Sequence, residues 1–178
     1  MDRKNKYVLL DAARMEEEIE TAKGMNPEFD SLYRGRSEEN LASVAPYIFS
    51  LNRGSEFEQW YFEKGWGDSW GILVYSDEDL KTLHKHFRKF LMVQKEDGEE
   101  LYFRFYDPRV LRIFLPTCDQ LQLRELFGPV DFFICEDEEP LTGLVFSFED
   151  KLLKTEKISK EMAINFEPGE KKRKFTFF

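Results

Sequence analysis

The chain has 178 residues, of which 26 are Lys or Arg and 35 are Asp or Glu, so its formal net charge is −9. This acidic surplus excludes a general nucleic-acid binder, because phosphate groups are bound by basic surfaces. Hydrophobic residues make up 42% of the chain and charged residues 34%, a composition typical of one globular domain with a sizeable core.

Over residues 1–130, short apolar runs alternate with stretches of helical periodicity. We first expect a strand over 7–10 that ends at Asp11, a helix over 14–23 stopped by Gly24, and a loop over 26–36 in which Leu32 and Tyr33 touch the core. A strand over 46–51, a helix from Ser55, a strand over 72–75 and a helix from Ser76 through Phe90 should follow. The last elements of this part are strands over 91–95 and 101–106, a helix from Asp107, and a helix from Thr117 to Phe127. The strands over 91–95 and 101–106 are expected to form a hairpin, because Asp97-Gly98 between them is a strong turn signal.

Four of these helices begin with side chains suited to capping backbone N–H groups. Three starts have the spacing of a capping box, in which two side chains satisfy the first N–H groups reciprocally: Ser55 with Glu58, Ser76 with Asp79, and Thr117 with Gln120. At the fourth start, Asp107 supplies the cap oxygen and Pro108 takes the first helical position, where a missing N–H costs nothing.

After Pro129 the pattern changes to strands only. Residues 132–135, 144–148 and 152–157 predict a β-meander. We therefore expect an α+β fold with two parts that pack into a single globular unit. The parts are a mixed β-sheet with flanking helices over residues 1–130 and a β-rich C-terminal lobe over residues 131–178.

Positive charge gathers near the end of the chain, and Lys171–Lys174 is its densest run. We interpret this run as a solvated tail, or as an edge strand kept soluble by lysines. Docking onto an acidic partner is the alternative.

No stretch approaches the roughly 20 apolar residues of a membrane helix. The charged residues 1–6 lead straight into the first strand, without the apolar core of a signal peptide. We therefore expect a cytoplasmic protein with no direct membrane association. Cys118 and Cys135 lack metal-ligand or redox spacing, so we expect two reduced structural thiols.

The loop Gly65–Gly71 does not fit a nucleotide-binding loop, because it follows a helix and opens a strand, the reverse of the dinucleotide fingerprint. Its bulky Trp66 and Trp70 are expected to pin the loop either to the core or to a partner. His84 and His86 are two residues apart on one helix and point to different faces, so they cannot hold one metal ion together. We therefore expect no cofactor and no metal.

A polar set stands at the junction between a strand and a helix. It consists of Arg104, Asp107, Arg109 and Arg112. A half-buried Arg needs a carboxylate partner, and we expect Arg109 to reach back to Asp11. The set is either a structural ion-pair network at the strand ends or a charged recognition site at the edge of the sheet, where open α/β sheets bind ligands.

Six stretches together resemble one known family: Tyr7–Ala13, Ser31–Gly35, Ala45–Leu51, Gly65–Ile72, Leu83–Leu91 and Phe103–Leu111. In this order and spacing, over residues 5–130, they resemble the effector chaperone and adaptor proteins of the bacterial type VI secretion system. The junction Phe103-Arg-Phe-Tyr-Asp-Pro-Arg109 and the Trp-Gly strand entry before Ile72 are the most informative parts of the match.

The resemblance implies a cytoplasmic chaperone or adaptor without catalytic activity. Such a protein binds a toxic effector of the secretion system and loads it onto the VgrG spike protein. The implied partners are therefore the effector and VgrG, and we expect surface aromatic side chains on one face to contact the effector. The residues that we expect to contact a partner are Trp66, Trp70, Arg104, Tyr106, Asp107 and Arg109.

Two other functions stay open on the residues alone. An immunity-type or other protein-binding module would bind one toxin and no spike protein. An enzyme built from carboxylates far apart in the sequence would have a deep cleft lined by them, or a His of perturbed pKa. The sequence contains no nucleophile elbow, P-loop or His-Glu-x-x-His motif.

Overall fold

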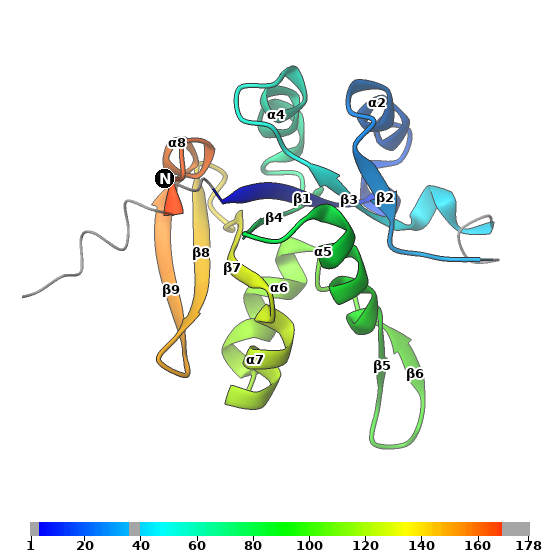
Figure 1. The fold of residues 1–178 in the computed structure, drawn as a ribbon, viewed down its shortest axis with the longest axis vertical. Helices are drawn as coiled ribbons and strands as arrows, with labels where there is room; N and C mark the ends of the chain where they lie inside the picture. The colour runs from blue at the N-terminus through cyan, green and yellow to red at the C-terminus, as the bar shows by residue number, and fades with distance from the viewer. Residues whose placement is uncertain (1–3, 36–39, 169–178) are drawn as a thin grey trace, which may run out of the picture.

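The computed structural model describes residues 4–35 and 40–168, and seven of its strands form one sheet in the order β2-β3-β1-β4-β7-β8-β9 (Figure 1). These strands are β1 (Asn5–Asp11), β2 (Phe29–Ser31), β3 (Pro46–Ser50), β4 (Gly71–Ser76), β7 (Val130–Glu136), β8 (Thr142–Glu149) and β9 (Leu152–Ser159). The α+β class is confirmed. One refinement applies to the expected mixed sheet, since every pairing among the described strands is antiparallel.

Helices cover both faces of this sheet, with α2 and α4 on one side and α5, α6 and α7 on the other (Figure 1). The helical segments are α1 (Ala12–Met15), α2 (Glu18–Met25), η1 (Ala42–Val44), α4 (Glu56–Trp60), the π-helical η2 (Tyr61–Gly65), α5 (Leu80–Phe87), η3 (Arg88–Phe90), α6 (Pro108–Phe114), η4 (Leu115–Thr117), α7 (Gln120–Phe127) and α8 (Lys160–Ile164). A separate two-stranded hairpin consists of β5 (Met92–Gln94) and β6 (Glu100–Tyr102).

The central position of β1 in the sheet explains why its residues are continuously apolar instead of alternating with polar ones. It pairs with β3 on one side and β4 on the other, so that Leu9 lies opposite both Ile48 and Ile72. Because helices cover both faces of the sheet, Val8 and Leu10 are fully buried, as is Leu9, which points to the opposite face. The core is therefore built outward from β1 in both directions.

The helix expected over residues 14–23 is wrong as a single element. Asp11 caps α1 by accepting a hydrogen bond from the Ala13 N–H at 3.0 Å, so the helical chain begins earlier than predicted. Glu16 then takes a positive φ of 55° and ends α1. The chain restarts as α2, which runs past the expected stop at Gly24.

Two strand predictions near irregular segments are also corrected. The loop expected over residues 26–36 contains the short strand β2, whereas Leu32 is buried as expected and residue 36 lies outside the described residues. The strand expected over residues 101–106 ends with β6 at Tyr102. The chain turns after that point, so Phe105 and Tyr106 are both buried instead of alternating between core and solvent.

Side-chain caps start the helices, but not always through the predicted residue. The Ser55 and Asp107 caps are confirmed. The cap of α5 is Asp79 and not Ser76, and the cap of α7 is Asp119 with Gln122 in place of Thr117 with Gln120. In both helices the N-cap is the Asp directly before the first helical residue, because Asp is a strong N-cap residue.

The meander after Pro129 is confirmed as β7, β8 and β9. The expectation of strands only is wrong, because Ser159 caps the short helix α8. β7 pairs with β4, so the sheet is continuous across residue 130. The basic run Lys171–Lys174 lies outside the described residues. Within residues 4–35 and 40–168, no helix has the length and apolar character needed to cross a bilayer.

The close approach of β1 and β4 depends on Gly71, because a Cβ there would lie 1.9 Å from the carbonyl oxygen of Leu9. We expect Gly71→Ala to lower the free energy of unfolding by about 3 kcal/mol, since two paired backbones must separate. Gly24→Ala is the matched control, because nothing lies within 4 Å of a Cβ there, inside α2. It should stabilise the fold by about 0.5 kcal/mol. Equal effects of the two changes in chemical denaturation would contradict the register of β1 against β4.

Candidate functional site

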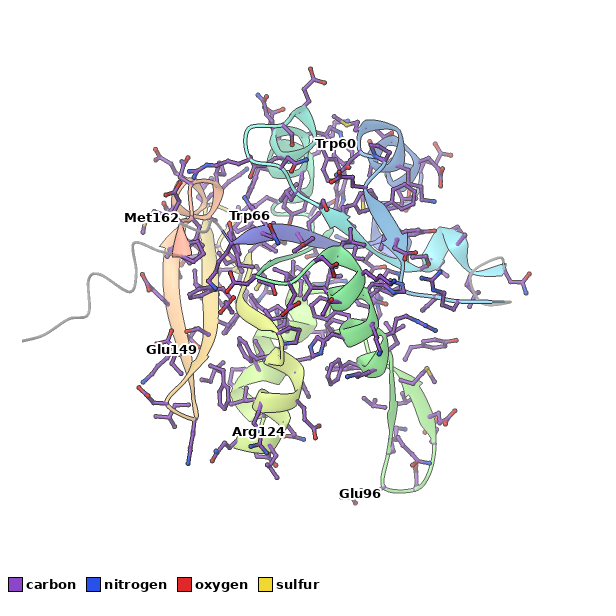
Figure 2. All side chains as sticks on the ribbon, viewed as in Figure 1. Trp60, Trp66, Glu96, Arg124, Glu149 and Met162 are labelled. Carbon is purple, nitrogen blue, oxygen red and sulfur yellow. The ribbon has the colours of Figure 1, made fainter. Side chains whose placement is uncertain are left out.

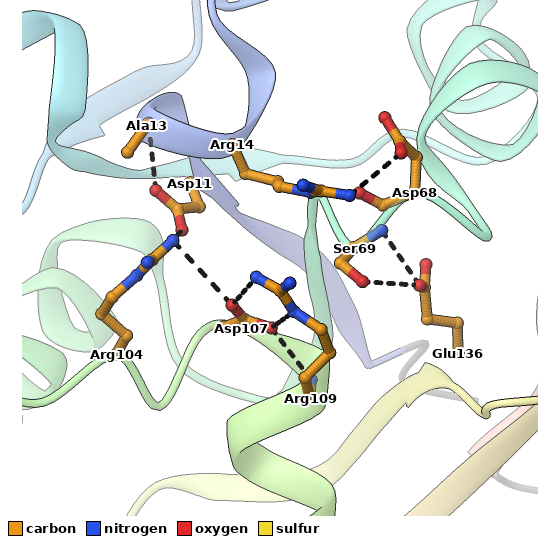
Figure 3. Close-up of polar contacts among 9 residues, drawn as sticks. All are labelled: Asp11, Ala13, Arg14, Asp68, Ser69, Arg104, Asp107, Arg109 and Glu136. Atoms are coloured by element: carbon orange, nitrogen blue, oxygen red, sulfur yellow. Dashed lines mark hydrogen bonds and ion pairs between the residues drawn. The ribbon is translucent and has the colours of Figure 1, made fainter.

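Polar side chains converge where the central strands end (Figure 3). Because β1, β4 and β7 are antiparallel neighbours, the last residue of β1, the first of β4 and the last of β7 lie at the same edge. Asp11 ends β1, Glu136 ends β7, and the Gly65–Gly71 loop enters β4 beside them. The start of α6 brings Asp107 to the same place. This end of the sheet is the candidate site.

The first ion pair joins Asp11 to Arg104. The Asp11 side chain is fully buried, whereas 41% of the Arg104 side chain is exposed, so the guanidinium spans the boundary between core and solvent. A buried carboxylate needs such a partner, since a charge removed from water without one costs several kcal/mol. The expectation that Arg109 reaches Asp11 is therefore corrected, because Arg104 forms this contact.

The second ion pair joins Asp107 to Arg109 in a fork. The Nε and Nη2 groups of Arg109 donate to the two carboxylate oxygens at 3.0 and 2.7 Å, and the Arg109 backbone N–H donates at 2.9 Å. Arg104 Nη2 lies 3.8 Å from Asp107, which links the two pairs. Burial acts to raise the pKa of Asp107, but the bonds from Arg109 and the charge of Arg104 outweigh it and hold this pKa below its ordinary value.

A third buried carboxylate, Glu136, was not identified from the sequence. It accepts hydrogen bonds from the N–H groups of Gly67 at 2.7 Å and Ser69 at 2.9 Å, and from the Ser69 hydroxyl at 3.1 Å. Arg112 donates to its backbone carbonyl at 3.0 Å. Burial raises the pKa of Glu136 although these donors act the other way. The available signal was a single Glu directly after the apolar run 132–135.

Both loop tryptophans pack into the core, which confirms one of the two roles considered for them. Trp66 and Trp70 are each 5% exposed. The Trp66 ring lies against the backbone at Gly143, where a Cβ would come within 2.8 Å of it, and the Trp70 ring covers Gly65 in the same way at 2.6 Å. The Trp70 Nε1–H donates to Asp68 at 3.0 Å.

The structure brings three of the expected partner-binding residues together, namely Arg104, Asp107 and Arg109. Tyr106 is only 3% exposed, and burial raises the pKa of its phenol. Trp66, Trp70 and Tyr106 therefore offer little side-chain surface to a partner. Whether the remaining three residues contact a partner stays a prediction.

Arg14, which the sequence did not single out, joins the site from α1. Its Nε and Nη2 donate to the backbone and side chain of Asp68 at 2.9 and 3.2 Å. The side chains of Arg14, Arg104 and Arg109 are 39, 41 and 48% exposed, whereas Asp11 and Asp107 are 0 and 3% exposed. Asp11 and Asp107 thus lie inside while the guanidinium groups face solvent, together with the Asp68 carboxylate, which is 58% exposed beside Arg14. The solvent-facing guanidinium groups could contact an anionic group of a partner.

The two histidines lie outside this site and face different segments. His84 Nε2 lies 2.7 Å from the Ser31 carbonyl, and His86 Nε2 lies 2.8 Å from the Leu126 carbonyl. The expectation that they do not share a metal ion is consistent with these separate partners. The two cysteines are free thiols, and burial raises the pKa of Cys118 to about 11.

A comparison with protein families gives a match over much of the chain. The family model described as "Domain of unknown function (DUF4123)" matches residues 6–125, which is more than half of the chain and includes all six stretches of the resemblance. Neither the curated proteins nor the solved structures contain a significant match to the chain.

Asp107 is both a helix cap and the acceptor of an arginine fork. We expect Asp107→Ala to lower the free energy of unfolding by about 3 kcal/mol, because it removes the cap and leaves the Arg109 guanidinium without its carboxylate. Asp107→Asn keeps a cap oxygen and should cost less. The control Asp119→Ala removes only the cap of α7 and should cost about 1 kcal/mol. Equal losses for Asp107→Ala and Asp119→Ala in urea denaturation would argue against the fork.

The raised pKa of Glu136 makes its contribution to stability depend on pH. The folded state binds the Glu136 proton more tightly than the unfolded state does. The contribution of Glu136 to the free energy of unfolding is therefore lost as pH rises from 4.5, the ordinary pKa of a Glu side chain, through the raised pKa of the folded state. Glu136→Gln keeps an acceptor for the loop and removes the titration. The free energy of unfolding of the wild type should therefore fall relative to the Gln variant over this window. A constant difference between the two proteins would contradict the raised pKa.

Proposed function

Because the chain belongs to the DUF4123 family, we propose that it is a cytoplasmic chaperone and adaptor that binds a type VI secretion effector and loads it onto the VgrG spike. The observation that carries the proposal is the family match over residues 6–125, which includes the six stretches that resemble such adaptors. The adaptor role comes from the resemblance. The family match supports the range of residues, 6–125, over which the chain and the family are alike.

The chemistry of the candidate site supports recognition of a partner over catalysis. Its carboxylates are engaged by fixed partners, since Asp11 caps α1 and pairs with Arg104 while Asp107 holds Arg109. A general acid at neutral pH needs a raised carboxyl pKa, and the pKa of Asp107 is lowered. The raised pKa of Glu136 belongs to a carboxylate whose oxygens are occupied by the loop N–H groups of Gly67 and Ser69. The polar groups that face solvent are the side chains of Arg14, Arg104 and Arg109, and the Asp68 carboxylate that pairs with Arg14.

The burial of the aromatic residues changes which surface the adaptor would use. The aromatics named as contacts, Trp66, Trp70 and Tyr106, hold the site from inside. In this proposal the arginines at the end of the sheet, Arg14 and Arg109 among them, provide the solvent-facing contacts. Arginine is suited to this role, because a guanidinium has five N–H donors, and those that do not bond to Asp68 or Asp107 are left for a carboxylate of the partner.

The first test is an affinity pull-down of the tagged protein from its own bacterium at low salt, with bound proteins identified by mass spectrometry. We expect one large toxin-like effector and a VgrG spike protein. We also expect Arg14→Glu to reduce this recovery, because it reverses the charge of a solvent-facing guanidinium. Arg124→Glu, on the exposed face of α7 (Figure 2), makes the same change in net charge away from the site and is the control.

Three outcomes are informative. Recovery of a single small toxin without a spike protein would favour the immunity-type module. An empty bait would contradict the adaptor role and give weight to an enzyme. Equal losses for Arg14→Glu and Arg124→Glu would show that recovery follows net charge and not the arginine surface.

A further inference from the structure

The β5–β6 hairpin projects from the molecule away from the seven-stranded sheet (Figure 1). Every residue from Met92 to Tyr102 is exposed, including both strands and the turn. Its base is fixed by a hydrogen bond of 2.8 Å from the Phe103 N–H to the Leu91 carbonyl and by the contact of the Tyr102 ring with Tyr33, at 5.9 Å between centroids. Two strands without a third are marginally stable in water, and every residue of β5 and β6 is exposed.

Large apolar side chains are concentrated on these two short strands. Met92, Val93, Leu101 and Tyr102 are 42, 41, 37 and 57% exposed. The register pairs Met92 with Tyr102 and Val93 with Leu101, so the two pairs lie on opposite faces of the ribbon. Both faces near the base are therefore apolar and solvated, which is unusual for a surface without a binding role.

The tip of the hairpin is acidic. Between Gln94 and Leu101 the chain carries Glu96, Asp97, Glu99 and Glu100 against a single Lys95, and that lysine pairs with Glu99. The surface thus combines an apolar base with a tip of negative charge. A partner that matches it needs apolar side chains and Lys or Arg together.

We propose that the β5–β6 hairpin binds an extended segment of a partner protein in which a block of apolar side chains is followed by a block of Lys or Arg, and that this segment adds to the ribbon as a third strand, with its apolar block at the base and its basic block at the tip. In the described part of the chain neither strand pairs with a third, so each outer edge is available for main-chain hydrogen bonds. The identification of the partner as the effector rests on the proposed function. The chemistry of the segment rests on the hairpin alone.

Charge favours this occupant over two others. A second copy of the chain has a net charge of −9 and brings a second acidic hairpin, so like charges would meet. An anionic lipid surface would likewise repel the carboxylates at the tip, since membrane surfaces attract basic segments. A basic and apolar strand is attracted to the tip and covers the base.

The test uses two short synthetic peptides, one with a run of valines followed by a run of lysines and one with a run of valines followed by a run of glutamates, added to the isotope-labelled full chain. We expect the lysine peptide to shift the amide NMR signals of residues 92–102 before those of the rest of the chain, and the glutamate peptide to shift none. Glu96→Gln with Glu100→Gln should weaken binding of the lysine peptide about fivefold, because each exposed charge contributes modestly to such a contact. Glu125→Gln with Glu161→Gln changes net charge equally on α7 and α8, and should leave it unchanged.

The inference would be overturned if the lysine peptide shifted no amide signals, or if it shifted signals scattered over the acidic surface. It would also be overturned if the two double variants lost affinity for the lysine peptide equally. The same holds if the glutamate peptide acts like the lysine peptide. If the hairpin ignores the lysine peptide while the pull-down still recovers an effector and a spike protein, the inference is wrong and the proposed function stands. Binding of the lysine peptide together with an empty pull-down would support the inference and contradict the proposed function.

Discussion

Three carboxylates buried at one end of the central strands set the conditions for the rest of the structure. Asp11, Asp107 and Glu136 are each at most 4% exposed, and an uncompensated charge at such a position is strongly destabilising. Each is satisfied by a segment distant in sequence or by a helix start: Arg104 for Asp11, Arg109 for Asp107, and the loop before β4 for Glu136. The network thereby joins β1, β4, α6 and β7 at one end of the sheet (Figure 3), and its guanidinium groups are the part exposed to solvent.

The local elements of this fold follow from the sequence, and the contacts between them do not. The apolar run of β1, the Asp107-Pro108 helix start and the final meander were predicted because period, capping and turn chemistry act within a few residues. The pair of Asp11 with Arg104 spans 93 residues and the bonds of Glu136 to its loop span up to 69, so periodicity carries no information about them. The single helix predicted over 14–23 failed for a local reason instead, since Asp11 caps α1 from two residues away and the positive φ of Glu16 ends it.

Aromatic residues that the sequence makes candidates for a binding surface can be part of the core instead. The tryptophans of the β4 entry and Tyr106 were candidates for contact with a partner, and they lie in the core. Their burial positions the backbone at the end of the sheet, and the side chains left in solvent are arginines there and apolar pairs on the β5–β6 hairpin. Both surfaces meet at the chain segment from Tyr102 to Arg104, so a partner strand on the hairpin would approach the arginine layer. In the proposed adaptor, an acidic tip, an apolar ribbon and the exposed guanidinium groups of paired arginines would lie next to one another on the surface offered to a partner.

The central claim is that this chain connects an effector to the VgrG spike. The most direct measurement is size-exclusion chromatography, with light scattering, of the purified effector and spike protein mixed with and without the chain. The account predicts that effector and spike protein elute together only when the chain is present, and that the complex formed then contains the effector, the spike protein and the chain. Elution of effector with spike in the absence of the chain, or a chain that binds one of them and excludes the other, would contradict it.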